Sequence, residues 1–301
     1  MTTQVTIVGS SNVDITALME RLPGPGETVL ADSYRLTPGG KGANQALAAA
    51  LAGARTEFIG AVGNDGHASI ALGQLEEAGV ELRRVIHRDG ATGVAIISVD
   101  SRAENSIAVV SGANASVDAA AVNAAGTLDG VLVLQGEIPA SGIRAAFDAA
   151  KGPVVLNLAP VIELERDYLC RADPLVANEH EAALILQQLD GSEQAATEPE
   201  PVIARRLCAH GIRSVVITLG AEGCLVAQRE GTDIRLTTLP GTKVKAVDTT
   251  GAGDAFTGAL AARLATGHTL LEAAEFAGRF AASSVQRHGA QVSYPRSLED
   301  I

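Results

Sequence analysis

The chain has 301 residues, is 47% hydrophobic and carries a formal net charge of −12 at pH 7. That length and apolar content suffice for one large core, so we expect a single domain over residues 1–301, while the acidic balance leaves no continuous basic surface for a nucleic-acid partner. No stretch approaches the ~20 apolar residues of a membrane span, and the N-terminal apolar run is only strand-sized, so we expect a cytoplasmic protein that makes no membrane contact.

Short β-branched runs alternate with Ala- and Leu-rich amphipathic stretches, a pattern typical of a mostly parallel sheet flanked by helices. We therefore predict an α/β fold. The expected strands are residues 5–9, 57–61, 131–135, 154–158, 175–177 and 214–219. The expected helices are residues 43–52, 68–78, 140–149, 179–189, 202–209, 253–265 and 270–286.

Two segments, residues 15–36 and 93–111, break this alternation. Each is interrupted once by turn residues, near Pro23 to Gly26 and near Asp100 to Glu104, and each is predicted to be a pair of antiparallel strands without an intervening helix. We expect the two to form a small β lid that excludes water from a site beneath it. Residues 190–201 are expected to be a polar surface loop.

The first strand leads into Ser10-Ser11-Asn12-Val13-Asp14. Open α/β sheets bind ligands beyond the carboxyl ends of their strands, so Asn12 and Asp14 are candidate ligand contacts. The alternative is that both residues only form a turn.

A glycine-rich run, Gly39 to Gln45, precedes the first expected helix. Its glycines allow a small ligand to approach closely, and Lys41 and Asn44 supply hydrogen-bond donors. The run is neither a Walker A loop nor a dinucleotide fingerprint, because Gly42 stands where a Walker A loop requires Ser or Thr. The alternative is a plain turn with a solvated lysine.

Three further strand ends carry polar residues. Glu137 follows the strand at residues 131–135, and Asn178 and Glu181 open a helix, where they either form a capping box or orient waters around Mg²⁺. The segment from Thr218 to Gly223 is either a simple hairpin or a turn that lies beside a nucleotide.

Cysteine and histidine patterns give no indication of a metal centre. Cys170, Cys208 and Cys224 are odd in number and have no C-x-x-C spacing, so we expect reduced, buried thiols. His180 begins HEAAL and not H-E-x-x-H.

The run DTTGAGDAF, residues 248–256, is the most informative segment. Its small residues let backbone N–H groups converge on an anion, and the helix behind them adds a partial positive charge, so the run predicts a phosphate site. Asp254 lies among these donors as a carboxylate that can accept a proton. The alternative is that Asp254 caps the helix and the glycines turn the chain.

These segments in this order, above all SSNVD, GGKGANQA and DTTGAGD, resemble the ribokinase family of sugar kinases, also called the PfkB family of carbohydrate kinases, along nearly the whole chain. The resemblance implies a three-layer α/β/α fold with a mostly parallel central sheet and a small β-sheet lid. It also implies an enzyme that uses ATP and Mg²⁺, with K⁺ as an activator, to phosphorylate D-ribose at its 5-hydroxyl.

The same resemblance implies roles for individual residues. Asp254 would be the general base, and backbone N–H groups of Thr250 to Gly253, with Gly251, Ala252 and Gly253 as catalytic positions, would form an anion hole. The sugar-binding positions would be Asn12, Asp14, Gly39, Gly40, Lys41, Asn44, Glu137 and Asp254. The nucleotide-binding positions would be Asn178, Thr218, Leu219, Gly220, Ala221, Glu222, Gly223 and Gly253. The monovalent-cation positions would be Asp248, Thr250, Ser284, Arg287, Gly289 and Ser293, and Glu181 would hold Mg²⁺ through water.

The residue types independently favour a neutral sugar. Sugar hydroxyls suit carboxylates and amides, whereas a sugar phosphate would require an Arg or Lys clamp, which these segments lack. With 3% aromatic residues and no Trp, the chain has few partners for stacking a base, which disfavours a nucleoside. The alternatives that stay open are deoxyribose or another pentose, a nucleoside, and a non-catalytic sugar-binding protein. The exposed strand face expected for the lid predicts a homodimer that pairs through it.

Overall fold

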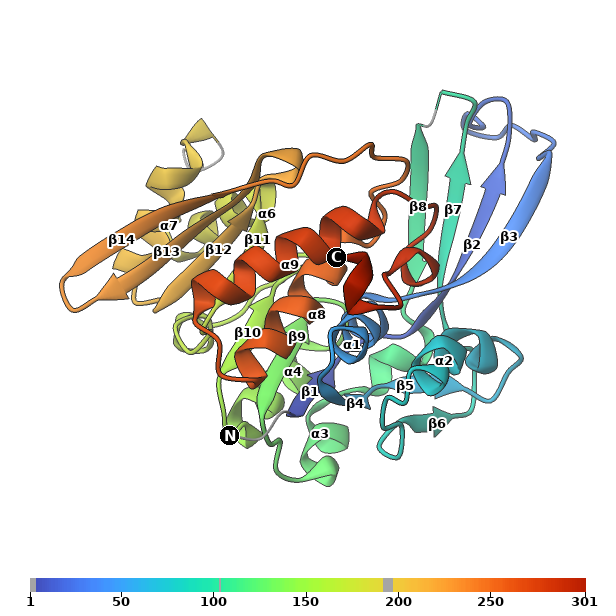
Figure 1. Cartoon of the computed structure of the whole chain (residues 1–301). Coiled ribbons are helices and arrows are strands. Elements are labelled where there is room, and N and C mark those ends of the chain that lie inside the picture. The colour runs from blue at the N-terminus through green and yellow to red at the C-terminus, as the bar shows by residue number, and fades with distance from the viewer. Residues whose placement is uncertain (1–3, 103, 192–196) are drawn as a thin grey trace.

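A computed structural model describes residues 4–102, 104–191 and 197–301, and its largest unit is an eight-stranded sheet of order β14-β13-β12-β11-β10-β9-β1-β4 (Figure 1). Six neighbouring strands are parallel, and β13 and β14 join one edge antiparallel. The predicted α/β class is confirmed. The strands of the large sheet are β1 Gln4–Val8, β4 Arg55–Ile59, β9 Val131–Gln135, β10 Val154–Asn157, β11 Leu175–Asn178, β12 Ser214–Thr218, β13 Gly223–Glu230 and β14 Asp233–Pro240.

Helices cover both faces of this sheet, which gives three layers. Strand β9 illustrates why: Val131 and Val133 point into one apolar core, and Leu132 and Leu134 point into the other. The first core is closed by α1 Lys41–Leu51, α2 His67–Glu77, α8 Ala252–Ala265 and α9 Leu270–Ser284. The second is closed by α3 Ala119–Ala125, α4 Ala140–Ala149, α5 Arg166–Leu169, α6 Glu179–Asp190 and α7 Glu200–Ala209.

Every expected strand and helix of this body corresponds to an element, with shifts at the ends. Helix α1 begins two residues before the predicted range, so Lys41 lies in its first turn. The predicted strand 57–61 is divided, because Ala61 belongs to a short strand, β5 Ala61–Gly63, that pairs with β6 Ile86–Arg88. The predicted loop 190–201 is bounded by the end of α6 and the start of α7, and residues 192–196 of it lie outside the described residues.

A second sheet of four strands has the order β3-β2-β7-β8 and extends from one end of the body (Figure 1). As predicted, each of the two segments forms an antiparallel pair, and the pairs join through a parallel contact between β2 and β7. We call this sheet the lid sheet. Its strands are β2 Asn12–Leu18, β3 Ser33–Gly39, β7 Gly93–Val99 and β8 Asn105–Val110.

The register of the lid sheet sorts its side chains onto two faces. Residues directly opposite one another share a face, so Asp14 lies on the same face as Ala95 and Val109. Ile15 and Ile96 lie on the other face. One face therefore carries predicted sugar-binding residues, and the other is largely apolar.

In the described part of the chain, no helix has the length and apolar character that a bilayer crossing requires.

Candidate active site

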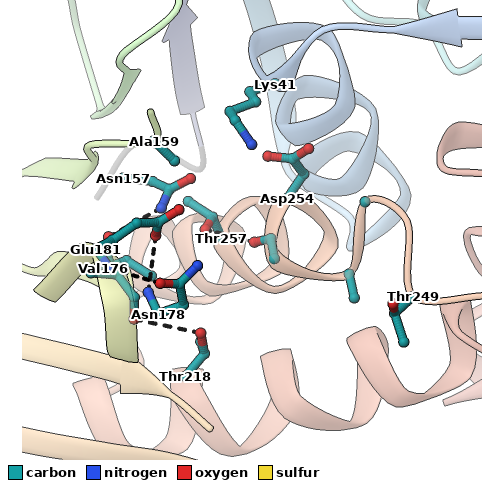
Figure 2. Close-up of a pocket in the computed structure, with 14 residues that line it drawn as sticks. Lys41, Asn157, Ala159, Val176, Asn178, Glu181, Thr218, Thr249, Asp254 and Thr257 are labelled. Carbon is teal, nitrogen blue, oxygen red and sulfur yellow. Dashed lines mark hydrogen bonds between the residues drawn. The ribbon is translucent and has the colours of Figure 1, made fainter. Parts of the chain in front are cut away.

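Two cavities lie at the carboxyl ends of the parallel strands. The smaller, of about 200 Å³, is lined by Asn157, Asn178 and Thr218 at the ends of β10, β11 and β12, and by the loop that opens α8 (Figure 2). The larger, of about 410 Å³, is lined by residues after β1 and β9 and by Val109 of the lid sheet. Open α/β sheets bind their ligands in this position.

The start of α8 places Asp254 in its first turn at the wall of the smaller cavity. Gly251 precedes the helix with φ 74°, and a Cβ there would lie 2.7 Å from the Cβ of Ala290, so the turn requires glycine. The Tyr294 hydroxyl donates a hydrogen bond to the Gly251 carbonyl over 3.0 Å. Gly251, Ala252 and Gly253 line the cavity at the start of this helix, which has no side-chain cap, so the first turn of α8 adjoins the cavity. The Ala252 N–H donates to the Thr249 carbonyl over 3.2 Å.

The carboxylate of Asp254 is 6% exposed and accepts two amide hydrogen bonds from α1. Asn44 Nδ2 donates to Oδ2 over 2.9 Å, and Gln45 Nε2 donates to Oδ1 over 2.9 Å. The sequence pattern had identified Asn44 but not Gln45. An ionised carboxylate has about four lone-pair directions, so a substrate hydroxyl still finds a free one.

Lys41 links the two cavities. Its side chain lines the smaller cavity and extends toward Asp254 in Figure 2, and its backbone N–H donates to Glu137, which lines the larger cavity, over 3.0 Å. The pKa of Lys41 is raised, chiefly by the negative charge of Asp254 and further by Glu137. Ser10 Oγ also donates to Glu137, over 2.5 Å.

Asp14 contributes a second acidic group to this region. Burial, followed by the charges of Glu137 and Asp254, raises its pKa from 3.8 to about 6. Its carboxylate lies against Gly39, where a Cβ would overlap it. Four predicted sugar-binding residues line neither described cavity: Asp14, Gly39, Gly40 and Asn44. Asn44 is nevertheless hydrogen-bonded to Asp254, and the negative charge of Asp254 contributes to the raised pKa of Asp14.

Asn12 does line the larger cavity, together with Asn114, a residue that the sequence analysis missed. Asn114 Nδ2 donates to Asn12 Oδ1 over 2.7 Å, and Asn114 Oδ1 accepts from the Ser11 N–H over 2.9 Å. A lone asparagine in a Gly-Ala-Asn-Ala-Ser turn carries no sequence signal of such a role. The pair fixes Asn12 at the base of the lid sheet.

Asn178 and Glu181 form the capping box that was one of the two predictions for them. Asn178 Oδ1 accepts from the Glu181 N–H over 2.8 Å, and Glu181 Oε2 accepts from the Asn178 N–H over 3.0 Å. Both also line the smaller cavity. Within the described ranges no group of three or more acidic, His or Cys residues is placed to hold a metal ion.

The segment after β12 is a turn into the antiparallel strand β13, with positive φ at Gly220 and Gly223. Thr218 lines the smaller cavity, whereas the other predicted nucleotide contacts in this turn do not.

Three of the residues predicted to bind a monovalent cation, Asp248, Thr250 and Gly289, come together from two distant segments. Asp248 accepts hydrogen bonds from Thr250 N–H over 2.9 Å and from Gly289 N–H over 2.9 Å, and the Val247 N–H donates to the Val285 carbonyl over 2.7 Å. Burial acts to raise the pKa of Asp248, but these bonds outweigh it and lower the pKa. Ser284 and Ser293, which precede and follow Gly289 in the sequence, are buried, and Arg287 is exposed.

Comparison with known proteins agrees with this geometry. The model of the pfkB family carbohydrate kinases matches residues 2–297. A ribokinase of Schizosaccharomyces pombe is 37% identical over 98% of this chain and 96% of its own length. The crystal structure of a ribokinase from Thermotoga maritima superposes with a TM-score of 0.90 at 32% identity, over 98% of this chain and 97% of that one. An Arabidopsis thaliana ribokinase complexed with ribose and ATP superposes with a TM-score of 0.83 at 31% identity, over 100% of this chain and 98% of that one.

Proposed function

The chain belongs to the pfkB family of carbohydrate kinases, and from this premise we propose that it transfers the terminal phosphate of ATP to the 5-hydroxyl of D-ribose. The observation that carries the proposal is the position of Asp254. Its carboxylate is buried at the wall of a cavity, beside the N-terminus of α8, with two amide donors that leave room for a hydroxyl. A proton acceptor and an anion site therefore adjoin, as phosphoryl transfer to an alcohol requires.

In this mechanism the sugar lies in the larger cavity, which Asn12 and Glu137 line. The remaining predicted sugar-binding residues complete its contacts: Asp14, Gly39, Gly40, Lys41 and Asn44. Asp254 accepts the proton of the 5-hydroxyl as the oxygen meets the γ-phosphorus. The backbone N–H groups of Gly251 and Gly253 stabilise the charge on the transferring group, and Lys41 supplies a positive charge between the cavities. The N–H groups of Thr250 and Ala252 already donate to Asp248 and to the Thr249 carbonyl.

The nucleotide phosphates occupy the smaller cavity, next to Asn178, Thr218 and Gly253. Mg²⁺, when bound through waters to Asn178 and Glu181, would neutralise the phosphate charge. K⁺, when bound between the 248–250 loop and residues 284–293, would hold that loop in the arrangement described above. The contacts of Asp248 with Gly289 and of Val247 with Val285 support this location, because they join the two segments.

The lid sheet is also proposed to be the contact surface of a homodimer. Ile96, Ile107 and Val110 are each about half exposed, at 49%, 56% and 52%. Exposed apolar side chains on a small sheet favour a partner, and a second copy of the chain presents the matching surface.

The experiment is a coupled assay of ADP release with MgATP and a panel of D-ribose, deoxyribose, another pentose, uridine and a sugar phosphate, each with potassium or sodium. We expect the highest kcat/KM for D-ribose and faster turnover in potassium. Higher activity on another acceptor would reassign the substrate. Ribose binding by calorimetry without any ADP release would identify a non-catalytic binding protein, and equal rates in the two salts would contradict the cation site.

A further inference from the structure

Gln45 is a buried side chain that lines neither cavity yet contacts the carboxylate at the centre of the site. It is 0% exposed, on α1, and faces Asp254 across the interior. Its two amide hydrogens go to two different acceptors, Asp254 Oδ1 over 2.9 Å and Asn157 Oδ1 over 3.0 Å. A buried amide with this many directed bonds has one permitted orientation.

That orientation is set from both ends. On one side, Gln135 Nε2 donates to Gln45 Oε1 over 2.7 Å. On the other side, Asn157 Nδ2 donates to the Val176 carbonyl over 3.1 Å, so Asn157 presents its oxygen to Gln45. Reversing the Gln45 amide would turn its oxygen toward the Asp254 carboxylate and toward the Asn157 oxygen. Three acceptors would then face one another in a buried site, at a cost of several unmade hydrogen bonds.

A second chain of amides reaches the other oxygen of the same carboxylate. Gln291 Nε2 donates to Asn44 Oδ1 over 3.0 Å, and Asn44 Nδ2 donates to Asp254 Oδ2. One chain of amides begins on β9 and the other begins in the C-terminal segment, and they end on different oxygens of the carboxylate. Together they restrain the rotation of the carboxylate about its last bond.

We propose that Gln45 is a positioning residue, which holds the Asp254 carboxylate oriented for the proton of the substrate hydroxyl. The inference rests on the proposed function, since it assigns Gln45 a role in the same reaction. Gln45 lines neither cavity, so it acts through its two acceptors, Asp254 and Asn157, which both line the smaller cavity. Other ionisable groups near Asp254 are Lys41 of α1, Asp14 of β2, Glu137 after β9 and Tyr294 near the C-terminus.

The test is Gln45→Met, which keeps the length and apolar volume of the side chain but removes the donors. We expect kcat to fall roughly 10- to 100-fold with ribose and ATP KM values nearly unchanged, because the base is misplaced and the binding groups are not. The acidic limb of the kcat profile should move to higher pH, since a buried carboxylate with one fewer N–H donor is harder to ionise.

Two further variants keep the test decisive. Gln135→Met removes only the bond that orients Gln45, so kcat and its acidic limb should change in the same directions but less. This variant provides the test if Gln45→Met does not fold. Gln188→Met makes the same replacement at a glutamine that donates to the Leu164 carbonyl, far from the site, and should leave kcat and its pH profile unchanged.

The outcomes separate the inference from the proposed function. Wild-type enzyme that releases no ADP with any sugar overturns the proposed function. If the wild type is active and Gln45→Met leaves both kcat and its pH profile unchanged, the role of Gln45 is overturned. If Gln45→Met does not fold, the same result in Gln135→Met overturns it. A loss of kcat without movement of the acidic limb, matched by Gln188→Met, would assign Gln45 a purely structural effect and would also overturn it.

Discussion

The α/β body and the lid sheet differ in how firmly they hold their functional groups. In the body, Asp254 is held by amides that are themselves held by other amides, between two helical layers and a sheet with an apolar core on each face. In the lid sheet, strand β8 is exposed along its whole length, and Val13 and Ile15 of β2 pack against α2 of the body.

We therefore expect the body and the lid sheet to contribute to different steps of the reaction. In the proposed mechanism, the groups that take part in proton and phosphoryl transfer come from the body, where small displacements are resisted by close packing. The lid sheet contributes Asp14 and Val109, which are proposed to contact the sugar and to move with the sheet. Substitutions in the body should therefore change kcat, and substitutions in the lid sheet should change KM or assembly.

The largest effect is expected in the body, for Asp254→Asn. An amide cannot accept the hydroxyl proton as a carboxylate does, so kcat should fall ~10²- to 10⁴-fold with little change in ribose binding. Steady-state kinetics and ribose titration calorimetry measure the two quantities. Turnover equal to wild type would remove Asp254 from its role as the base.

Asp14→Asn makes the corresponding change on the lid sheet. A charge-assisted hydrogen bond to a sugar hydroxyl is lost, so the ribose KM should rise about 10- to 100-fold while kcat changes little. Because the pKa of Asp14 is raised to about 6, ribose affinity of the wild type should also fall as the pH drops through about 6. Asp32→Asn, at an exposed position of the segment between β2 and β3, is the control. A fall in kcat alone would contradict the division between body and lid.

Asp14→Asn should stabilise the ligand-free protein, although it weakens ribose binding. The Asp14 carboxyl ionises near pH 3.8 when unfolded and near pH 6 when folded, so the fold carries the full cost of the charge above about pH 6 and none of it below about pH 4. The Tm of ligand-free Asp14→Asn should equal or exceed that of wild type at pH 8, and the advantage should vanish at pH 4. A lower Tm at pH 8 would show that Asp14 stabilises the empty site.

Gly251→Ala sharpens the comparison within the body, because it alters backbone and not a charge. A Cβ at φ 74° is strained and also meets Ala290, so the turn before α8 must shift, and kcat should fall about 10-fold. Gly73→Ala, in a helical position where a Cβ meets nothing within 4 Å, is the matched control and should retain wild-type kcat. Equal kcat in both variants would mean that the Gly251 turn does not position the anion site.

The smallest effect on catalysis is expected at the outer part of the lid sheet. Ile96 and Ile107 point to opposite faces, so Ile96→Glu and Ile107→Glu distinguish which face pairs with a second copy. The variant on the pairing face should become monomeric in light scattering at micromolar concentration, with kcat nearly unchanged. A monomeric wild type, or two dimeric variants, would contradict pairing through the lid sheet.

Periodicity and strand-end motifs were sufficient to predict a mostly parallel sheet flanked by helices, the lid pairs and some of the residues that line the cavities, such as Asn12, Glu137 and Asp254. The local patterns of Asn44, Glu137 and Asp254 carry their chemistry, because each lies in a recognisable turn or strand end. The short helix α3 was missed, since seven mostly Ala residues give little periodic signal.

Residues that act through tertiary contacts were not predictable in this way. Gln45, Asn114 and Asn157 become significant only when distant segments meet: Gln45 and Asp254 are 209 positions apart, and Asn114 and Ser11 are 103 apart. An amide in a helix or turn has no local feature that distinguishes a satisfied core residue from one that orients a catalytic group.

A crystal structure with D-ribose and a non-hydrolysable ATP analogue would show whether Asp254 receives the proton of the sugar hydroxyl. We expect a carboxylate oxygen of Asp254 within about 2.6–3.2 Å of the 5-hydroxyl, with the γ-phosphate against the backbone N–H groups at the start of α8. A carboxylate turned away from every sugar oxygen, or a γ-phosphate that does not touch these N–H groups, would contradict it.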